Sequence, residues 1–134
     1  ELALESLHDF AENTTKRRMV EQAYNDAVPE DWRMPRRDAP WVYDLRIPGM
    51  TRRQQYAIVN RMNNAGVDAR MGFLPMTAQQ EYREEMGPGV AKAADEVMYL
   101  PIWPDWSDAD VEAVLAELEA ATRGVLRDIP PFGV

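Results

Sequence analysis

The residues best suited to chemistry lie close together between Arg70 and Tyr82. This stretch carries a guanidinium at Arg70, a hydroxyl at Thr77 and amides at Gln79 and Gln80. A guanidinium forms paired hydrogen bonds with carboxylate or phosphate groups. Binding residues are frequent on loops that rigid elements position. The segment is therefore a candidate binding site for an anionic group, although composition alone favours an ordinary surface loop.

Other catalytic chemistry is excluded by the residue types that the sequence lacks. The chain has no cysteine and one histidine, His8. Disulfides, thiolate nucleophiles, multi-histidine metal sites and a serine–histidine–acid triad within this chain are therefore ruled out. We expect His8 to be a solvated or packing residue, and we expect no metal site.

Two further stretches resemble functional motifs but favour simpler interpretations. The run Met86-Gly87-Pro88-Gly89-Val90-Ala91-Lys92 places glycines near a lysine. It lacks the P-loop spacing and no strand precedes it, so we expect a plain loop. Trp103 and Trp106 flank Pro104-Asp105 just before a helix. This favours an anchoring role at the start of the helix over a stacking platform for a ligand.

Length and charge set the class of protein. The chain has 134 residues, of which 46% are hydrophobic and 28% charged, with a formal net charge of −8. These values predict a globular protein with one domain over residues 1–134. The negative charge argues against nucleic acid as a partner. No apolar run approaches the length of a membrane span, and no signal pattern opens the sequence. We expect a cytoplasmic protein, and the missing initial Met suggests a fragment of a longer one.

The hydrophobic pattern predicts the elements that must position the Arg70–Tyr82 segment. A helix is expected over 2–28, with Thr14-Thr15 as a candidate bend, and an irregular connection over 29–40. Strands are expected at 41–47, 67–73 and 96–102, an irregular stretch at 74–95, and helices over 51–65 and after 107.

Local signals mark the ends of these elements. Thr51 is the expected N-cap of one helix, and Gly66 the glycine that follows its end. Ser107 with Asp110 forms a variant of the capping box for the last helix. Pro101 predicts that the third strand is an edge strand, or that its pairing ends there. The sequence as a whole predicts an α+β fold, with a small three-stranded sheet, helices on one face and helices at both ends.

Several segments, in the right order and spacing, resemble one family. Asn60 to Arg70 is similar to the "L-x-x-x-G-I-x-[ST]-R" passage of the DegT-type sugar aminotransferases, and Phe73 to Tyr82 to their "Y-x-P-L-H-x-Q-P-x-[FY]" loop. Met98 to Val111 resembles their "L-x-L-P-L-x-P-x-L-S-D-x-D-V" passage. Upstream, Arg18 to Asn25 and Trp41 to Ile47 match a helix and a strand of the same proteins. The resemblance covers nearly the whole chain.

The resemblance implies a function for the longer protein. These enzymes use pyridoxal 5′-phosphate to transfer an amino group to a keto sugar carried on a nucleotide. The chain resembles their C-terminal small domain, which implies a large catalytic domain as partner and a homodimer of the full enzyme. The family's sugar-contacting loop falls on Arg70–Tyr82. Arg70 is therefore expected to bind an anionic group of the substrate, and Thr77 and Gln79 its hydroxyls.

Two departures and one absence qualify this expectation. The family's loop histidine falls on Thr77, and a second family histidine falls on Gly72, which indicates a divergent substrate or a weakened function. Lys16 and Lys92 are the only lysines, and neither stands in the family's cofactor-lysine context. We therefore expect the chain alone to be inactive, with no catalytic or cofactor-binding residue. The alternative is a free-standing, non-catalytic domain, or a partner subunit that completes another chain's active site.

Overall fold

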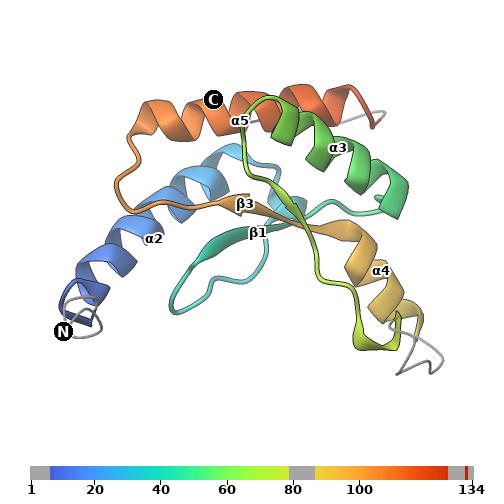
Figure 1. Ribbon diagram of the computed structural model, residues 1–134, viewed down its shortest axis with the longest axis horizontal. Helices are drawn as coiled ribbons and strands as arrows, with labels where there is room; N and C mark the ends of the chain where they lie inside the picture. Colours follow the sequence, from blue (N-terminus) through green and yellow to red (C-terminus); the bar gives the residue numbers. More distant parts are fainter. Residues whose placement is uncertain (1–6, 79–86, 127–131, 133–134) are drawn as a thin grey trace.

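The computed structural model describes residues 7–78, 87–126 and 132. Within them lie four helices, a three-stranded sheet and two short 3₁₀ turns (Figure 1). The elements, in chain order, are α2 (Phe10–Ala27), η1 (Glu30–Trp32), β1 (Val42–Arg46), α3 (Arg52–Asn64), β2 (Arg70–Met71), η2 (Met76–Ala78), α4 (Pro88–Glu96), β3 (Val97–Pro101) and α5 (Asp108–Arg123). This is the α+β fold that the sequence predicts, with helices towards both ends.

The sheet is antiparallel and its strand order is β1-β3-β2. Val42 lies opposite Pro101 and Arg46 opposite Val97, while Arg70 lies opposite Tyr99 on the other side of β3. The prediction that β3 is an edge strand was wrong, because β3 is the centre of the sheet. The alternative prediction is confirmed, since the pairing ends at Pro101, which has no N–H to donate.

One face of the sheet carries the core. Tyr43, Leu45, Met98 and Leu100 are buried on that face. They belong to one cluster with buried residues of the helices, among them Val20, Tyr24, Ile58, Met62, Val111, Val114 and Leu118. Figure 1 shows α3 and α5 lying above the sheet, with α2 running beneath α5 and α4 projecting beyond the start of β3.

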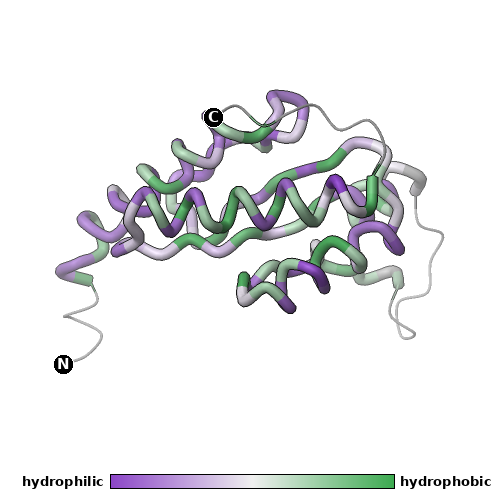
Figure 2. Tube along the Cα trace, turned by 90° about the horizontal axis from the view of Figure 1, so that it is seen from above, coloured by the Kyte–Doolittle hydropathy of each residue, from purple (hydrophilic) through white to green (hydrophobic). Residues whose placement is uncertain are grey.

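Hydrophobic and hydrophilic residues alternate along the helices, as expected when one helix face is buried (Figure 2). Two tyrosines join the helices to the sheet. The rings of Tyr24 and Tyr43 lie 4.9 Å apart. Tyr24 donates to the carbonyl of Pro101 over 3.0 Å, and Tyr43 donates to Asn25 over 2.9 Å. Burial raises the pKa of both hydroxyls, so both stay protonated as donors.

The helix ends follow the local signals. Thr51 caps α3 in a complete capping box with Gln54, and Ser107 caps α5 in one with Asp110. Gly66 has a φ of 90° just beyond α3, a conformation that suits glycine. The candidate bend at Thr14-Thr15 is absent, because α2 runs through it and the Thr15 hydroxyl donates to Ala11 O over 2.9 Å.

Two predicted elements were wrong. Part of the stretch predicted to be irregular is helix α4, which includes most of the Gly87–Lys92 run. Backbone N–H groups in the first turn of a helix have no partner within the helix, so proline, which lacks an N–H, is tolerated there. Pro88 occupies that position in α4. The second strand is shorter than 67–73. Ala69 N donates to the Asn63 side chain over 3.0 Å, and the strand pairing with β3 covers only Arg70 and Met71.

Candidate functional site

The second face of the sheet, which we call the open face, is not covered by α2, α3 or α5. Along β3, half-buried Val97, Tyr99 and Pro101 alternate with buried Met98 and Leu100. Side chains alternate between the two faces of a strand. Tyr99 therefore lies on the open face, in one row with its pairing partners Asp44 and Arg70. Tyr99 also lines two separate pockets on this face.

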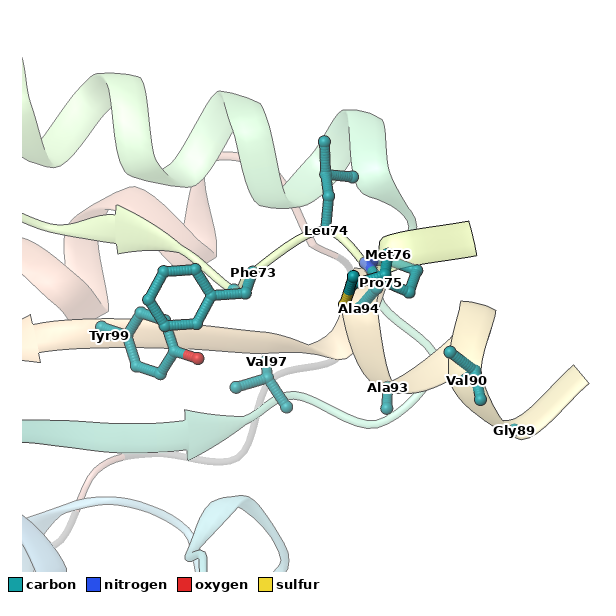
Figure 3. Close-up of a pocket in the computed structure, with 11 residues that line it drawn as sticks. Phe73, Leu74, Pro75, Met76, Gly89, Val90, Ala93, Ala94, Val97 and Tyr99 are labelled. Atoms are coloured by element: carbon teal, nitrogen blue, oxygen red, sulfur yellow. The ribbon is translucent and has the colours of Figure 1, made fainter. Parts of the chain in front are cut away.

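The larger pocket, which we call the apolar pocket, has a volume of about 590 Å³. It lies between α4 and the segment that follows β2 (Figure 3). The rings of Phe73 and Tyr99 lie 5.5 Å apart on its sheet side. Its lining is Gly72, Phe73, Leu74, Pro75, Met76, Gly89, Val90, Ala93, Ala94, Val97 and Tyr99. Of these, Phe73, Leu74, Met76 and Val90 are largely exposed, an arrangement typical of a surface that another molecule or domain covers.

Gly72 allows the chain to pass very close to β3. Its N–H donates to Val97 O over 2.9 Å. A Cβ at this position would lie 2.5 Å from the same oxygen. A side chain at residue 72 would therefore require the backbone of β2 or β3 to shift.

The smaller pocket, which we call the aromatic pocket, has a volume of about 230 Å³. It lies where β3 ends and β1 begins. Trp41 and Trp103 are 51% and 58% exposed, and Tyr99 is half-buried. The lining is completed by Asp68 and Arg70 from the β2 side and by Val42, Leu100, Pro101 and Ile102.

Arg70 stands at the edge of the aromatic pocket. Its Nη2 donates to Asp68 Oδ2 over 2.9 Å, and its Nε lies 3.3 Å from Oδ1. The hydrogen bond to Asp68 raises the pKa of Arg70 further, so the guanidinium is always charged. Both side chains are about two-thirds exposed. The ion pair therefore contributes little to the stability of the fold. The hydrogen bonds to Asp68 come from Nη2 and Nε, and none comes from Nη1.

Of the other predicted contact residues, the structure describes only Thr77. Thr77 lies in η2, directly after residues that line the apolar pocket. Gln79, Gln80 and Tyr82 lie outside the described residues. The described structure thus brings Arg70 to one pocket and the backbone of Thr77 beside the other.

Glu96 fixes the junction of α4 and β3, which forms one wall of the apolar pocket. Its carboxylate is buried and accepts hydrogen bonds from Arg46 and from Gly49 N–H, each at 2.7 Å. Burial by itself would raise the pKa of Glu96. The Gly49 N–H and the Arg46 guanidinium outweigh it, so this pKa lies below its usual value.

α3 holds the same junction from the other side. The Gln55 amide is fully buried and donates to Ala94 O over 3.1 Å and to Val97 O over 2.5 Å. Arg52 donates to Ala94 O over 3.0 Å. These bonds satisfy carbonyls at the end of α4 that have no partner within the helix. Sequence reasoning missed Gln55 and Glu96. For Gln55, a polar residue at a core position of the helix predicted over 51–65 was a usable signal.

Neither lysine has the surroundings of a cofactor lysine. Lys16 lies 2.9 Å from Glu12 and 3.3 Å from Asp105, and the hydrogen bonds that it donates to these carboxylates raise its pKa. A Schiff-base lysine needs the opposite shift. Lys92 lies 3.8 Å from Glu96. Neither lysine therefore has an environment that favours Schiff-base formation with pyridoxal 5′-phosphate.

The structure divides the two tryptophans that precede α5. Trp106 is partly buried and packs against the core, as expected of an anchor at the start of a helix. Trp103 instead lines the aromatic pocket with most of its side chain exposed. Trp41 and Tyr99 were not singled out from the sequence. The period-two alternation of β3 could have placed Tyr99 on the open face.

Within residues 7–78, 87–126 and 132, no cluster of three or more histidine or acidic side chains could hold a metal ion. None of the helices described is long and apolar enough to cross a membrane.

The fold is similar to that of several solved structures, among them two that are described as aminotransferases. One from Streptococcus pneumoniae, described as a sugar aminotransferase, matches with a TM-score of 0.79 and 16% identity, over 92% of this chain and 34% of that chain. The aminotransferase TlmJ from Streptoalloteichus hindustanus matches with a TM-score of 0.71 and 26% identity, over 88% and 34%. The synthase of 3-amino-5-hydroxybenzoic acid matches with a TM-score of 0.67 and 15% identity, over 87% and 35%.

The sequence agrees with this class of protein. The model of the DegT/DnrJ/EryC1/StrS aminotransferase family matches residues 1–119, and the chain belongs to that family. No curated protein sequence matches the chain significantly. The chain spans about a third of the length of the solved structures it matches, at 34% for the first two.

Proposed function

We propose that the chain is the small domain of a pyridoxal-phosphate-dependent aminotransferase whose substrate is a keto sugar linked to a nucleotide. The observation that carries the proposal is the family match over residues 1–119. The fraction of the solved relatives that the chain spans supports the role of one domain of a longer enzyme. As the family resemblance implies, the full enzyme would be a cytoplasmic homodimer.

The cofactor would be bound by residues outside this chain. The S. pneumoniae relative has been solved in a PLP form. In this chain both lysines lie near carboxylates. The cofactor lysine, the acid that pairs with the pyridine nitrogen and the phosphate-binding loop would therefore belong to the large domain.

The open face is the part of this chain that would meet the large domain. The apolar pocket exposes Phe73, Leu74, Met76 and Val90 beside the sheet. Covering such side chains is favourable by roughly 25 cal/mol for each Å² of apolar surface. The large domain would close over this face and leave the substrate cleft along its edge, where Arg70 and the 76–78 turn lie.

The residues of this chain would bind and orient the substrate. Arg70 can offer the N–H groups of Nη1 to an anionic group while Asp68 holds its other side. Thr77 and Gln79 would contact hydroxyls. Fixing the substrate in this way lowers the entropic cost of the reaction, while bond-making would fall to the large domain.

The direct test is the activity of the full-length protein. Purified with the cofactor, it should convert a nucleotide-linked keto sugar to the amino sugar with glutamate or glutamine as donor. Arg70→Ala should weaken substrate binding by at least about tenfold and leave the cofactor absorbance unchanged. Arg53→Ala, an exposed arginine of α3, is the matched control. A full-length protein with bound cofactor and no amino transfer to any keto sugar would overturn the proposed substrate class.

A second test concerns the isolated chain. Mixed with pyridoxal 5′-phosphate and reduced with borohydride, it should give no stoichiometric adduct on Lys16 or Lys92. A stoichiometric adduct on either lysine, found by peptide mass spectrometry, would contradict the assignment of the cofactor lysine to the large domain.

A further inference from the structure

The apolar pocket has two walls that belong to separate parts of the chain. One wall is the stretch from Gly72 to Met76, which we call the 72–76 segment, and the other is α4 (Figure 3). Arg52 of α3 donates to both walls from one nitrogen. Its Nη1 lies 3.0 Å from Ala94 O in α4 and 3.4 Å from Gly72 O at the start of the segment. A single guanidinium thus links the two walls.

We propose that Arg52 is a positioning residue, which fixes the 72–76 segment relative to α4 and so sets where the 76–78 turn with Thr77 lies. The inference rests on the proposed function for its link to the substrate, because the segment leads from β2 into that turn. Arg52 acts on the substrate only through the backbone that it holds.

Gln55, which follows Arg52 by three residues in α3, orients the guanidinium. Its Oε1 accepts from Arg52 Nη1 over 2.8 Å. Its Nε2 donates to Ala94 O and to Val97 O. The Gly72 N–H donates to the same Val97 O over 2.9 Å. The N–H and the C=O of Gly72 therefore both belong to one polar network, which fixes where the 72–76 segment begins.

Capping of α4 does not by itself account for Arg52. The carbonyls of Ala94 and Val97 already accept hydrogen bonds from the buried amide of Gln55. The further contact that Arg52 adds is the one to Gly72 O. Partial burial of a charge costs free energy, and among the described residues the acceptors of Arg52 are uncharged oxygens. Arg52 therefore adds a geometric link between two walls rather than a helix cap.

The position of Gly72 determines the course of the residues that follow. The pairing of β2 with β3 covers Arg70 and Met71, and the Gly72 N–H extends it by one bond. Residues 72–75 belong to no helix or strand before η2 begins. Phe73 follows Gly72 directly, and its ring lies 5.5 Å from that of Tyr99. A displacement at Gly72 would therefore pass to the pocket lining and to the 76–78 turn.

The first experiment measures hydrogen–deuterium exchange of the full-length protein by mass spectrometry. Arg52→Met keeps an apolar stem and removes the donors, whereas Arg52→Lys keeps a charged donor. In Arg52→Met, peptides that contain Gly72 or residues 94–97 should exchange at least about threefold faster, because they lose hydrogen bonds. Peptides of α5 should exchange as in the wild type. Arg52→Lys should show a smaller effect. If Arg52→Met does not fold, Arg52→Lys is compared with Arg53→Lys instead.

Steady-state kinetics of the same full-length variants test the link to the substrate. Arg52→Met should raise the KM for the keto sugar by about tenfold and leave kcat within about twofold, since a displaced contact segment weakens binding. The cofactor absorbance should be unchanged, and Arg52→Lys should recover part of the loss. A mere reduction of the folded fraction would lower the apparent kcat and leave KM unchanged. Arg53→Met, at an exposed neighbour in α3, is the matched control and should equal the wild type in both experiments.

The outcomes distinguish this inference from the proposed function. Exchange in Arg52→Met that equals the wild type, or that is faster throughout the chain including α5, overturns the inference. Locally faster exchange with an unchanged KM shows that the network affects stability alone, so the inference is wrong while the proposed function stands. If the wild type transfers no amino group, the proposed function fails. The exchange measurements then decide whether Arg52 fixes the 72–76 segment.

Discussion

Glu96 is a buried carboxylate that accepts hydrogen bonds from a guanidinium and from a backbone N–H. It joins the end of β1, the Gly49 turn and the start of β3 through Arg46 and the Gly49 N–H. Hydrogen bonds to a charged group stabilise a fold by about 1.5–3 kcal/mol. Glu96→Gln should therefore lower the free energy of unfolding at pH 7 by about 2 kcal/mol, measured by urea denaturation.

The same residue should give the wild-type chain a defined acid sensitivity. The pKa of Glu96 lies below the ordinary value of 4.5 in the folded state, so its ionised form stabilises the fold. That contribution is complete above pH 4.5 and is lost as the pH falls through the lowered pKa. The difference between the wild type and Glu96→Gln should thus shrink below pH 4.5. The matched control, Glu112→Gln on the exposed side of α5, should show no such convergence.

Asp44 is a buried carboxylate with the opposite behaviour. Its Oδ2 pairs with Arg37 over 2.6 Å, while its buried Oδ1 has no hydrogen-bond partner among the described residues. Burial raises its pKa above the ordinary value, and Arg37 offsets this only in part. Asp44→Asn should therefore change the stability at pH 7 by no more than about 1 kcal/mol.

The sign of the pH effect tests this account of Asp44. The ionised carboxylate destabilises the fold, and that cost disappears as the pH falls through its raised pKa. The wild type should gain stability relative to Asp44→Asn between pH 7 and pH 4, measured by urea denaturation across that range. A relative loss over this range would show that the ion pair with Arg37 dominates instead.

The close approach of the β2 end to β3 depends on one glycine. A Cβ at residue 72 would lie 2.5 Å from Val97 O, a backbone atom that cannot rotate away. Gly72→Ala should destabilise the fold by about 1–3 kcal/mol and displace Phe73 from Tyr99. Gly89→Ala is the matched control, because nothing lies within 4 Å of a Cβ there. Residue 89 is in a helix, so the control should be neutral or mildly stabilising. Thermal unfolding of both variants decides the matter, and equal melting temperatures would refute the clash.

The start of α5 depends on the cap that Ser107 provides. Its side chain accepts from Asp110 N, and the Asp110 carboxylate accepts from Ser107 N over 2.8 Å. Ser107→Ala should cost about 1 kcal/mol, whereas Ser107→Gly should cost only a few tenths, since glycine is tolerated at this position. α5 packs against α2 and α3, so the loss should appear in the global unfolding transition. A loss confined to helical fraying would show that α5 is not part of the cooperative unit.

At the scale of the whole molecule, the two faces of the sheet differ in how much apolar surface they expose to solvent. The face beneath α3 and α5 carries the core, and the open face exposes Phe73, Leu74, Met76 and Val90. The isolated chain should therefore bind an apolar dye such as ANS in its native state, and Val90→Asp should reduce that binding without lowering stability. Met19→Asp, at a residue of α2 that is 70% exposed, is the control. Dye binding that falls equally in both variants would contradict a role for the apolar pocket.

The parts of the fold that could be predicted are those written in a few neighbouring residues. Two capping boxes satisfy backbone N–H groups at the start of a helix, Thr51 with Gln54 in α3 and Ser107 with Asp110 in α5. Gly66 follows the end of α3 with a positive φ. The sequence did not predict α4, because glycine and proline residues at its start are typical of a loop. Contacts with α3 and β3 favour the helix in the folded chain. Among these contacts are the hydrogen bonds that Arg52 and Gln55 donate to the carbonyl of Ala94.

The candidate site could be predicted only as a segment. The sequence predicted a binding role for Arg70, and the family match agrees with the resemblance on which that prediction rests. It did not bring Trp41, Tyr99 and Trp103 together, because these residues meet through strand pairing between distant parts of the chain.

The sequence by itself determined the α+β class, the helix caps and the family, because these depend on residue types and short spacings. The tertiary structure alone decided that β3 is the central strand, that one face of the sheet stays open, and that the backbone at Gly72 lies against Val97 O. These features depend on which distant segments pair, and pairing is selected by burial of apolar side chains over the whole fold. The prediction for Arg70 therefore came from the local sequence, whereas the pocket around this residue is a property of the folded sheet.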